Sequence, residues 1–256
     1  MPVTGGRARH DARNLGIGLL NTLPFTFGLG ALTASVALTV EKNSWGLLGA
    51  LSAPGWIDLA AGLILLDLWM YLWHVINHKM PLLWRFHRMH HSDNRLDASS
   101  AVRFHLGEVL LSFVLRLGII AILGLSIRHV VLYELVLIPV ILVHHANIAL
   151  PRPLEAVARW LVVTPDVHHV HHSRVRAETD SNYGSVLPWW DRLFRAFRMQ
   201  VPEKLRYGLD GWDDGWRQAF RGLLLTPFLS TSESAPTERT GTTDQAPGSE
   251  VDAKSE

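Results

Sequence analysis

The chain has 256 residues, of which 48% are hydrophobic and only 18% charged, and its formal net charge is +1. A charge this small gives no indication of nucleic acid, and no long basic stripe with interleaved aromatic residues is present, so we expect no nucleic-acid partner. The absence of cysteine excludes disulfides, thiolate zinc sites, cysteine-ligated iron–sulfur clusters and a cysteine nucleophile. A positive mean hydropathy and long apolar runs indicate an integral membrane protein.

The first apolar stretch covers about residues 15–40 and follows a polar segment, residues 1–14, that contains three arginines. It is long enough to span about 30 Å of hydrocarbon, so we expect a first transmembrane helix there. A cleaved signal peptide would have a shorter apolar core and a small-residue cleavage site. The small residues at 31–35 keep that alternative open.

The second apolar stretch, about residues 45–73, is interrupted by Pro54 and Gly55, which mark a break. We expect a short interfacial or re-entrant piece before the break and a spanning helix over residues 57–78 after it.

Asp67 lies within this second span, on the same helical face as His74 and His78. An ionisable residue inside a membrane segment indicates function. We hypothesise that Asp67 accepts a hydrogen bond from a ligand histidine and fixes its tautomer, in the second shell of a metal site. A hydrogen bond between two helices is the alternative.

Two further apolar runs, residues 106–127 and 130–145, are joined only by Arg128 and His129. A connection this short predicts a tight turn and a helical hairpin. Arg116 in the third run and Glu134 in the fourth are charges inside the membrane, and pairing them would reduce their cost.

Basic residues cluster before the first run, between the second and third, and after the fourth. The positive-inside rule then predicts four crossings with both termini in the cytoplasm.

Histidine is the most informative residue type. Twelve of the fourteen histidines fall in five groups that this topology brings to the cytoplasmic face: 74/78, 87/90/91, 105, 144/145 and 168/169/171/172. Positions three and four apart share a helical face, and neutral imidazole is a common metal ligand. So many imidazoles exceed what one metal ion binds, so we expect two ions. His10 and His129 lie outside the groups, and we expect them to have structural roles and their replacement by alanine to be silent.

The remainder of the chain contains an aromatic, arginine-rich segment at residues 181–198, which we expect to be a helix on the lipid boundary. An ordinary packing helix is the alternative. Beyond residue 228 the composition changes to Ser, Thr, Glu, Gly and Pro, which predicts a disordered tail over residues 229–256. Residues 15–228 would then form the membrane-embedded domain.

Several motifs occur in order: WHVINH at 73–78, WRFHRMHHSD at 84–93, AVRFHLGE at 101–108, HHANI at 144–148, TPDVHHVHHS at 164–173 and NYGSVLPWWDRLF at 182–194. Together they resemble the sterol desaturase and fatty acid hydroxylase family over roughly residues 55–200. The resemblance implies an all-α integral membrane fold, with about four transmembrane helices and a cytoplasmic helical cap that carries a histidine-ligated dimetal site.

Carried over residue by residue, the resemblance implies eleven metal ligands: His74, His78, His87, His90, His91, His105, His144, His145, His168, His171 and His172. Asn147 joins Asp67 as a second-shell residue, and no catalytic residue is expected beyond the ligands. His169 stands where the family often has another polar residue, so we expect a bystander. ArgAla at 195–196 replaces a GlyThr pair that the family often has, which affects the local turn rather than the metal site.

The resemblance further implies an O2-dependent oxidoreductase with two iron ions (Fe2+/Fe3+), which hydroxylates or desaturates a sterol, a fatty-acyl chain or a related lipid. We expect the electrons to come from a separate donor of the cytochrome b5, ferredoxin or reductase type, because no such domain fits beside four spans in this length. A carotenoid hydroxylase-like enzyme would differ only in its substrate. A metal transporter or metal-binding membrane protein is less favoured, because transport favours ligands near the bilayer midplane.

Overall fold

The computed structural model describes residues 6–200 and 205–230, and within these ranges the chain forms helices and loops without any strand. Four segments of the described chain are long and apolar enough to cross a membrane: Arg7–Leu51, Gly55–Lys79, Leu106–Leu123 and Ile127–His145. These segments confirm the expected all-α membrane fold. The tail predicted from residue 229 onward lies outside the described residues, apart from its first two positions.

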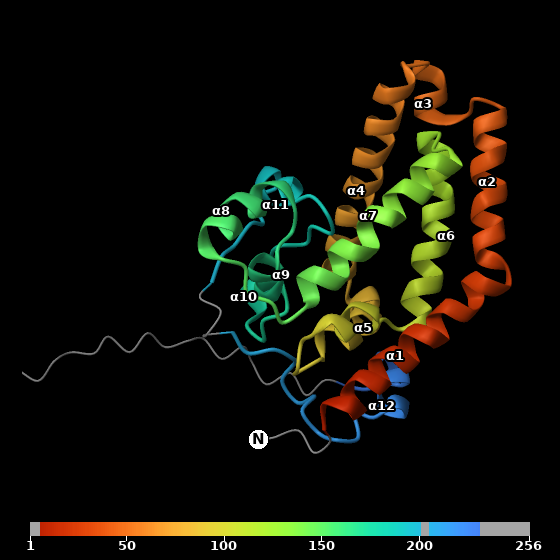
Figure 1. Ribbon diagram of the computed structural model, residues 1–256. Coiled ribbons are helices and arrows are strands. Elements are labelled where there is room, and N and C mark those ends of the chain that lie inside the picture. Colours follow the sequence, from red (N-terminus) through yellow and green to blue (C-terminus); the bar gives the residue numbers. More distant parts are fainter. Residues whose placement is uncertain (1–5, 201–204, 231–256) are drawn as a thin grey trace, which may run out of the picture.

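The first segment is not the single straight helix that the sequence predicts. It comprises α1 (Arg7–Pro24), a π-helical turn η1 (Phe25–Leu29), α2 (Gly30–Lys42) and, after a short turn, the helix α3 (Gly46–Leu51). Figure 1 shows α1 lying obliquely across one end of the molecule, whereas α2 stands along the other spans. The change of direction follows Pro24, which lacks an amide N–H, and coincides with non-helical backbone at Gly28. Helix α1 also runs through the boundary expected between residues 14 and 15.

The second apolar stretch of the sequence, about residues 45–73, breaks where Pro54 and Gly55 predict. A short helix α3 (Gly46–Leu51) precedes Pro54, and α4 (Gly55–Lys79) follows it as the longest single helix among the described residues. Leu66 of α4 is fully buried in an apolar core that includes Ile120 and Leu137 from the next two spans.

Helices α6 (Leu106–Leu123) and α7 (Ile127–His145) form the expected hairpin, but their turn lies earlier than predicted. Gly124 ends α6 in the left-handed region (φ 76°), where glycine meets no steric penalty, and Ser126 precedes α7. Arg128 and His129 therefore belong to the first turn of α7. The expected ion pair between Arg116 and Glu134 does form, across the hairpin.

Shorter helices gather at the end of the spans opposite α3 (Figure 1). They are α5 (Pro81–His91), η2 (Ala98–Val102), α8 (Arg152–Leu161), α9 (Pro165–His171), α10 (Arg176–Thr179), α11 (Trp189–Leu193), α12 (Phe220–Leu224) and η4 (Thr226–Phe228).

The long interfacial helix predicted over residues 181–198 is not present, because only α11 is helical there. Buried carboxylates hold the preceding chain in a non-helical path: Asp191 accepts the backbone N–H of Tyr183 at 2.7 Å, and Asp67 accepts that of Val186 at 3.2 Å. Burial raises the pKa of Asp191 to about 6.

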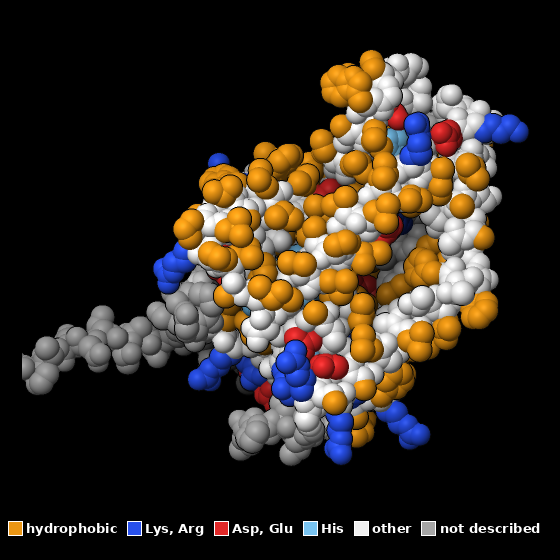
Figure 2. All heavy atoms as spheres, in the orientation of Figure 1, with side chains coloured by type: hydrophobic (Ala, Val, Ile, Leu, Met, Phe, Trp, Pro, Cys, Tyr) orange, Lys and Arg blue, Asp and Glu red, His pale blue; other side chains and the backbone are white. Residues whose placement is uncertain are grey.

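The amphipathic helix of this region is instead α8, which exposes Leu154, Val157 and Trp160. Figure 2 shows apolar side chains spread over the spans and over the part of the molecule where α8 lies.

Candidate metal centre

Four helices bring imidazoles to one place, where α4 and α7 end and α5 and α9 pack against them. Ring nitrogens gather in two groups, and within each group the nearest nitrogens all lie within 4.8 Å of one another. The five-histidine group consists of His74, His78, His87, His91 and His171, and the four-histidine group of His90, His145, His168 and His172. Helix α5 contributes to both groups: His87 and His91, four residues apart, belong to the five-histidine group, whereas His90 points about 100° away from His91 and belongs to the four-histidine group.

In four of the five histidines of the five-histidine group, one ring nitrogen is oriented by the protein and the other has no protein partner, whereas neither ring nitrogen of His91 has a partner among the described residues. The Nδ1 atoms face acceptors: the Tyr183 carbonyl for His74 (2.8 Å), the Ser181 carbonyl for His171 (2.7 Å), the Glu108 carboxylate for His87 (2.8 Å) and the Asp180 carboxylate for His78 (3.4 Å). The Nε2 atoms of these four histidines are buried and have no hydrogen-bond partner among the described residues. An acceptor at Nδ1 fixes the proton there and leaves the Nε2 lone pair available, which is the arrangement of metal-ligating histidines.

In the four-histidine group, the Nε2 atoms converge on one another. The Nε2 of His145 lies 3.2 Å from that of His90 and 3.1 Å from that of His168, which in turn lies 3.1 Å from that of His172. Two nitrogens bound to one metal at about 2.1 Å are about 3.0–3.4 Å apart, depending on geometry. The observed separations therefore fit ligands of a shared ion.

Burial keeps these imidazoles in the form that binds metal. Desolvation lowers the pKa of His171 from 6.5 to about 3, and it lowers the pKa values of His90, His91, His168 and His172 well below 6.5. The nearby imidazoles lower these pKa values further. Neutral imidazoles at neutral pH need not release protons to bind a cation.

The two groups thus fit two metal ions, with nine imidazoles divided five and four. Imidazole suits iron, zinc, copper and nickel, so the donor set alone does not select among these metals.

Two of the eleven expected ligands lie outside both groups. His144 is buried and stacks on His168 with ring centroids 3.8 Å apart. His105 begins α6, where its Nδ1 accepts the Gly107 backbone N–H (3.0 Å) and its Nε2 donates to the Leu224 carbonyl (3.0 Å). Both nitrogens of His105 therefore have protein partners, an arrangement that favours a helix-capping role over the expected role of metal ligand.

His169 points elsewhere than its neighbours on α9, as its helical position suggested. Its Nδ1 lies 3.1 Å from the Tyr207 hydroxyl, and it belongs to neither group.

Asp67 and Asn147, which we expected to support the metal ligands, lie in other surroundings in the structure. Among the described residues, no histidine donates a hydrogen bond to Asp67. Its carboxylate accepts hydrogen bonds from the Tyr133 hydroxyl and the Trp190 indole N–H, both at 2.8 Å, and from two backbone amides of the segment after residue 185. The alternative role, a bond between helices, is the one observed, because Tyr133 lies on α7. Asn147 is exposed and lies beyond the end of α7.

Sequence reasoning missed the residues that do orient the histidines. Two of these residues are Glu108 and Asp180. Glu108 could have been identified from the sequence, because it is the only acidic residue in the third apolar run. The carbonyls of Ser181 and Tyr183 carried no sequence signal, because every residue has a carbonyl.

A cavity of about 530 Å³ extends from the histidines into the space between the spans. Its walls come from α2, α4, α6 and α7, and they are mostly apolar, with Met70, Phe113, Leu137 and Ile141 among them. Six histidines line the same cavity: His74, His87, His90, His144, His145 and His168. Figure 2 shows a shaded recess in the surface beside α2. A long apolar molecule in this cavity would therefore reach both histidine groups.

Comparison with known proteins identifies a family and several similar proteins. A family model described as fatty acid hydroxylase matches residues 59–196. Ornithine lipid hydroxylase OlsE of Rhizobium tropici is 32% identical over 200 residues, covering 77% of this chain and 57% of that protein. Human alkylglycerol monooxygenase is 28% identical over 209 residues (80% and 44%), and a cholesterol 25-hydroxylase-like protein of Danio rerio is 30% identical over 159 residues (58% and 60%).

The chain spans about half the length of the curated relatives it matches. No solved structure matches it.

Proposed function

The chain belongs to the fatty acid hydroxylase family, and from this premise we propose that it is a membrane-bound, O2-dependent lipid hydroxylase with two iron ions. The relatives named above are hydroxylases and monooxygenases, and all three are named for lipids. These names favour hydroxylation over desaturation.

The observation that carries the proposal is the pair of histidine groups at the wall of an apolar cavity. A C–H bond of a lipid chain is inert to acid–base groups, so its oxidation requires a metal or an organic cofactor. Nine imidazoles, eight of them on buried residues and that of His74 on a partly buried one, supply a nitrogen donor set for non-haem metal in a chain without cysteine.

Two sets of residues have different roles here. The histidines would bind the metal, and their hydrogen-bond partners orient the imidazole rings. Bound at the two groups, iron would supply the redox chemistry with O2 that the side chains lack. Glu108, Asp180 and the carbonyls of Ser181 and Tyr183 fix the imidazoles by their Nδ1 atoms, so each Nε2 points inward. Burial excludes water from the imidazoles, and the cavity places hydrocarbon beside them.

We further propose that the end of the spans that carries the two histidine groups, here called the histidine end, faces the cytoplasm together with both termini. Arg and Lys lie mostly in segments at that end of the spans, whereas the turns at α3 and between α6 and α7 contain few. An electron donor would then dock on the cytoplasmic side, and residues 15–228 would form the catalytic, membrane-embedded unit.

The decisive experiment combines metal analysis with product analysis. Protein purified in detergent should contain about two irons per chain by elemental analysis. With O2 and a reductant, it should add one oxygen atom to a lipid from a membrane extract, as mass spectrometry would show. Iron-loaded protein that oxidises no lipid in such an extract, or a His90→Ala variant with full activity, would contradict the proposal.

A further inference from the structure

The cavity contains a charged pair far from the histidines. Arg116 of α6 and Glu134 of α7 both line it and form an ion pair with each other. Their side chains are 19% and 34% exposed, within two helices that span the membrane. Charges at such a depth are costly and indicate a functional role by default.

Glu134 uses only part of the hydrogen-bonding capacity of Arg116. The guanidinium donates through Nη1 to Glu134, whereas its Nε and Nη2 atoms are buried and find no acceptor among the described residues. A buried donor without a partner costs as much as a lost hydrogen bond, and more when it is charged. The cavity therefore presents N–H donors that an occupant can satisfy.

The charge balance indicates which acceptor fits. Glu134 already neutralises Arg116, so an anionic ligand would leave one net negative charge in a low-dielectric environment. An uncharged oxygen, such as a hydroxyl or a carbonyl, accepts the same hydrogen bonds without adding charge. The pair is therefore suited to a neutral oxygen rather than to a carboxylate or a phosphate.

Helix geometry gives the separation between this pair and the histidines. Arg116 follows Glu108, the partner of His87, by eight residues on α6, which is about 12 Å along the helix axis. Glu134 precedes His145 by eleven residues on α7, about 16 Å along that axis. The two polar ends of the cavity are thus separated by mostly apolar wall.

We propose that Arg116 determines specificity by selecting a lipid whose hydrocarbon body carries an uncharged hydroxyl or carbonyl oxygen, about 12–16 Å from the carbon held at the histidines. The inference rests on the proposed function in one respect: the histidine end is taken as the place where the lipid is oxidised. Glu134 acts through Arg116, holding the guanidinium in position and compensating its charge.

Binding without turnover tests this directly. Full-length protein in detergent, without reductant, is titrated with stearate and with a series of hydroxystearates that differ in the position of the hydroxyl, each displacing a fluorescent fatty acid. The chain and its carboxylate are the same throughout the series, so differences in affinity report the position of the hydroxyl. We expect isomers whose hydroxyl reaches Arg116 to bind roughly ten-fold more tightly than stearate.

Three variants sharpen the test. Arg116→Leu combined with Glu134→Leu removes both charges together, and we expect the preference for hydroxystearate to disappear while stearate binds as before. Arg128→Leu combined with Glu41→Leu removes an exposed ion pair (4.0 Å) outside the cavity and should keep the preference. Arg116→Lys keeps the ion pair with Glu134 but replaces the planar donor set of Nε and Nη2 by one ammonium group, so we expect the preference to fall or to move to another hydroxyl position.

The outcomes separate this inference from the proposed function. Wild-type protein that binds every isomer like stearate would overturn the inference, as would a preference that is unchanged in the Arg116 variants or is lost in the control. A His171→Ala variant should lose oxidation and keep the hydroxyl preference, so a failure of the oxidation chemistry would not be mistaken for a failure at Arg116.

Discussion

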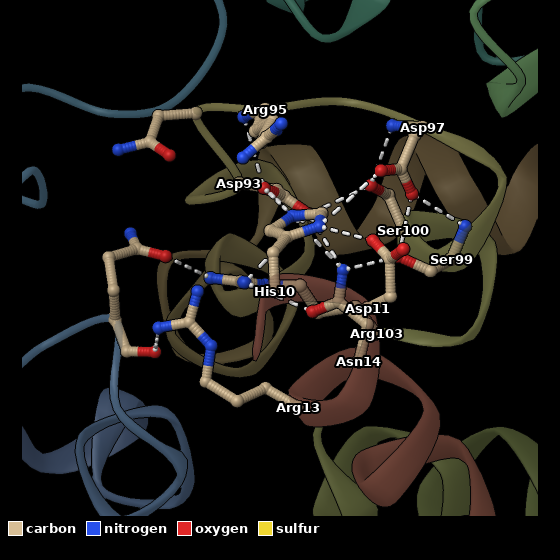
Figure 3. Close-up of polar contacts among 12 residues, drawn as sticks. His10, Asp11, Arg13, Asn14, Asp93, Arg95, Asp97, Ser99, Ser100 and Arg103 are labelled. Carbon is tan, nitrogen blue, oxygen red and sulfur yellow. Dashed lines mark hydrogen bonds and ion pairs between the residues drawn. The ribbon is translucent and has the colours of Figure 1, made fainter. Parts of the chain in front are cut away.

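Two buried polar clusters adjoin at the end of α5, and they differ in how their atoms are satisfied. In the five-histidine group the Nε2 atoms have no protein partner among the described residues, and in the four-histidine group they point at one another. Two residues after His91, Asp93 begins a second network in which the carboxylate is fully partnered (Figure 3). The first arrangement is what a bound ligand completes, and the second is complete without one.

The network around Asp93 ties α1 to the segment after α5. Asp93 accepts hydrogen bonds from His10 (2.8 Å), Asn14 (3.0 Å) and Ser100 (2.7 Å), and Figure 3 shows these side chains converging on it. Burial alone would raise the pKa of Asp93, but Arg103 and His10 lower it below its usual range. This cluster therefore stabilises the fold that presents the histidines.

His10 shows why proximity to carboxylates is not sufficient for a metal site. His10, Asp11 and Asp97 lie close enough to hold a cation. Yet both ring nitrogens of His10 already face carboxylates: Nδ1 lies 3.1 Å from Asp11, and Nε2 lies 2.8 Å from Asp93. Because no ring nitrogen is left over, we assign this group a structural role.

The largest effect should come from removing an imidazole of the five-histidine group. His171→Ala deletes one buried donor, so we expect bound metal to fall and lipid oxidation to drop to background. Elemental analysis and product analysis measure the two. His169→Ala is the matched control, because it lies on the same helix outside both groups. Equal metal loss in both variants would remove the distinction between grouped and ungrouped histidines.

Breaking the Asp93 network should instead damage stability. Asp93→Ala leaves Arg103 and His10 buried without their carboxylate, and we expect the free energy of unfolding to fall by about 3–5 kcal/mol. Thermal unfolding of metal-free protein in detergent measures this. His171→Ala should change metal-free stability much less. If the two variants destabilised the metal-free protein equally, the comparison between the clusters would fail.

The clusters should also differ in their response to pH. In unfolded chain the histidines bind protons near pH 6.5, whereas in folded metal-free protein the pKa of His171 is about 3. The unfolded state therefore binds more protons between these values, and the free energy of unfolding falls as the pH is lowered. Asp93, whose pKa is lowered, contributes stability that persists until the pH falls below about 4.

The measurement is the midpoint of thermal unfolding of metal-free protein at about pH 7.5 and about pH 5.5. The unfolding midpoint of the wild type should be lower at the lower pH. In His171→Ala, which has one such imidazole fewer, the decrease in midpoint should be smaller. A midpoint that rises on acidification would contradict the burial of neutral histidines.

Much of this architecture could be predicted from the sequence, because apolar length and histidine spacing are local properties. The spans, the break at Pro54 and the pairing of Arg116 with Glu134 follow from length, backbone chemistry and the cost of buried charge. The predictions differ from the structure where one local sequence pattern is compatible with several tertiary contacts. Asp67 shares a helical face with His74, yet its carboxylate is used by Tyr133 and the segment before α11.

The division of histidines between the two groups also required the structure. His90 and His91 are adjacent in sequence but belong to different groups, because successive residues on a helix point about 100° apart. The replacement of His10 by alanine was expected to be without effect, since nothing in the sequence near His10 indicates Asp93 as its partner. Its buried contact with that carboxylate predicts a loss of stability instead.

The smallest effect concerns His105, where motif and structure disagree most directly. As the cap of α6, its replacement by alanine should cost about 1 kcal/mol in the free energy of unfolding. His105→Asn keeps a side-chain acceptor for the Gly107 amide and should retain most of that stability. Metal content should be unchanged in both variants, because the ring nitrogens of His105 already have protein partners. Loss of metal from His105→Ala, with stability unaltered, would return this histidine to the set of ligands and would mean that a fully partnered nitrogen can still bind metal.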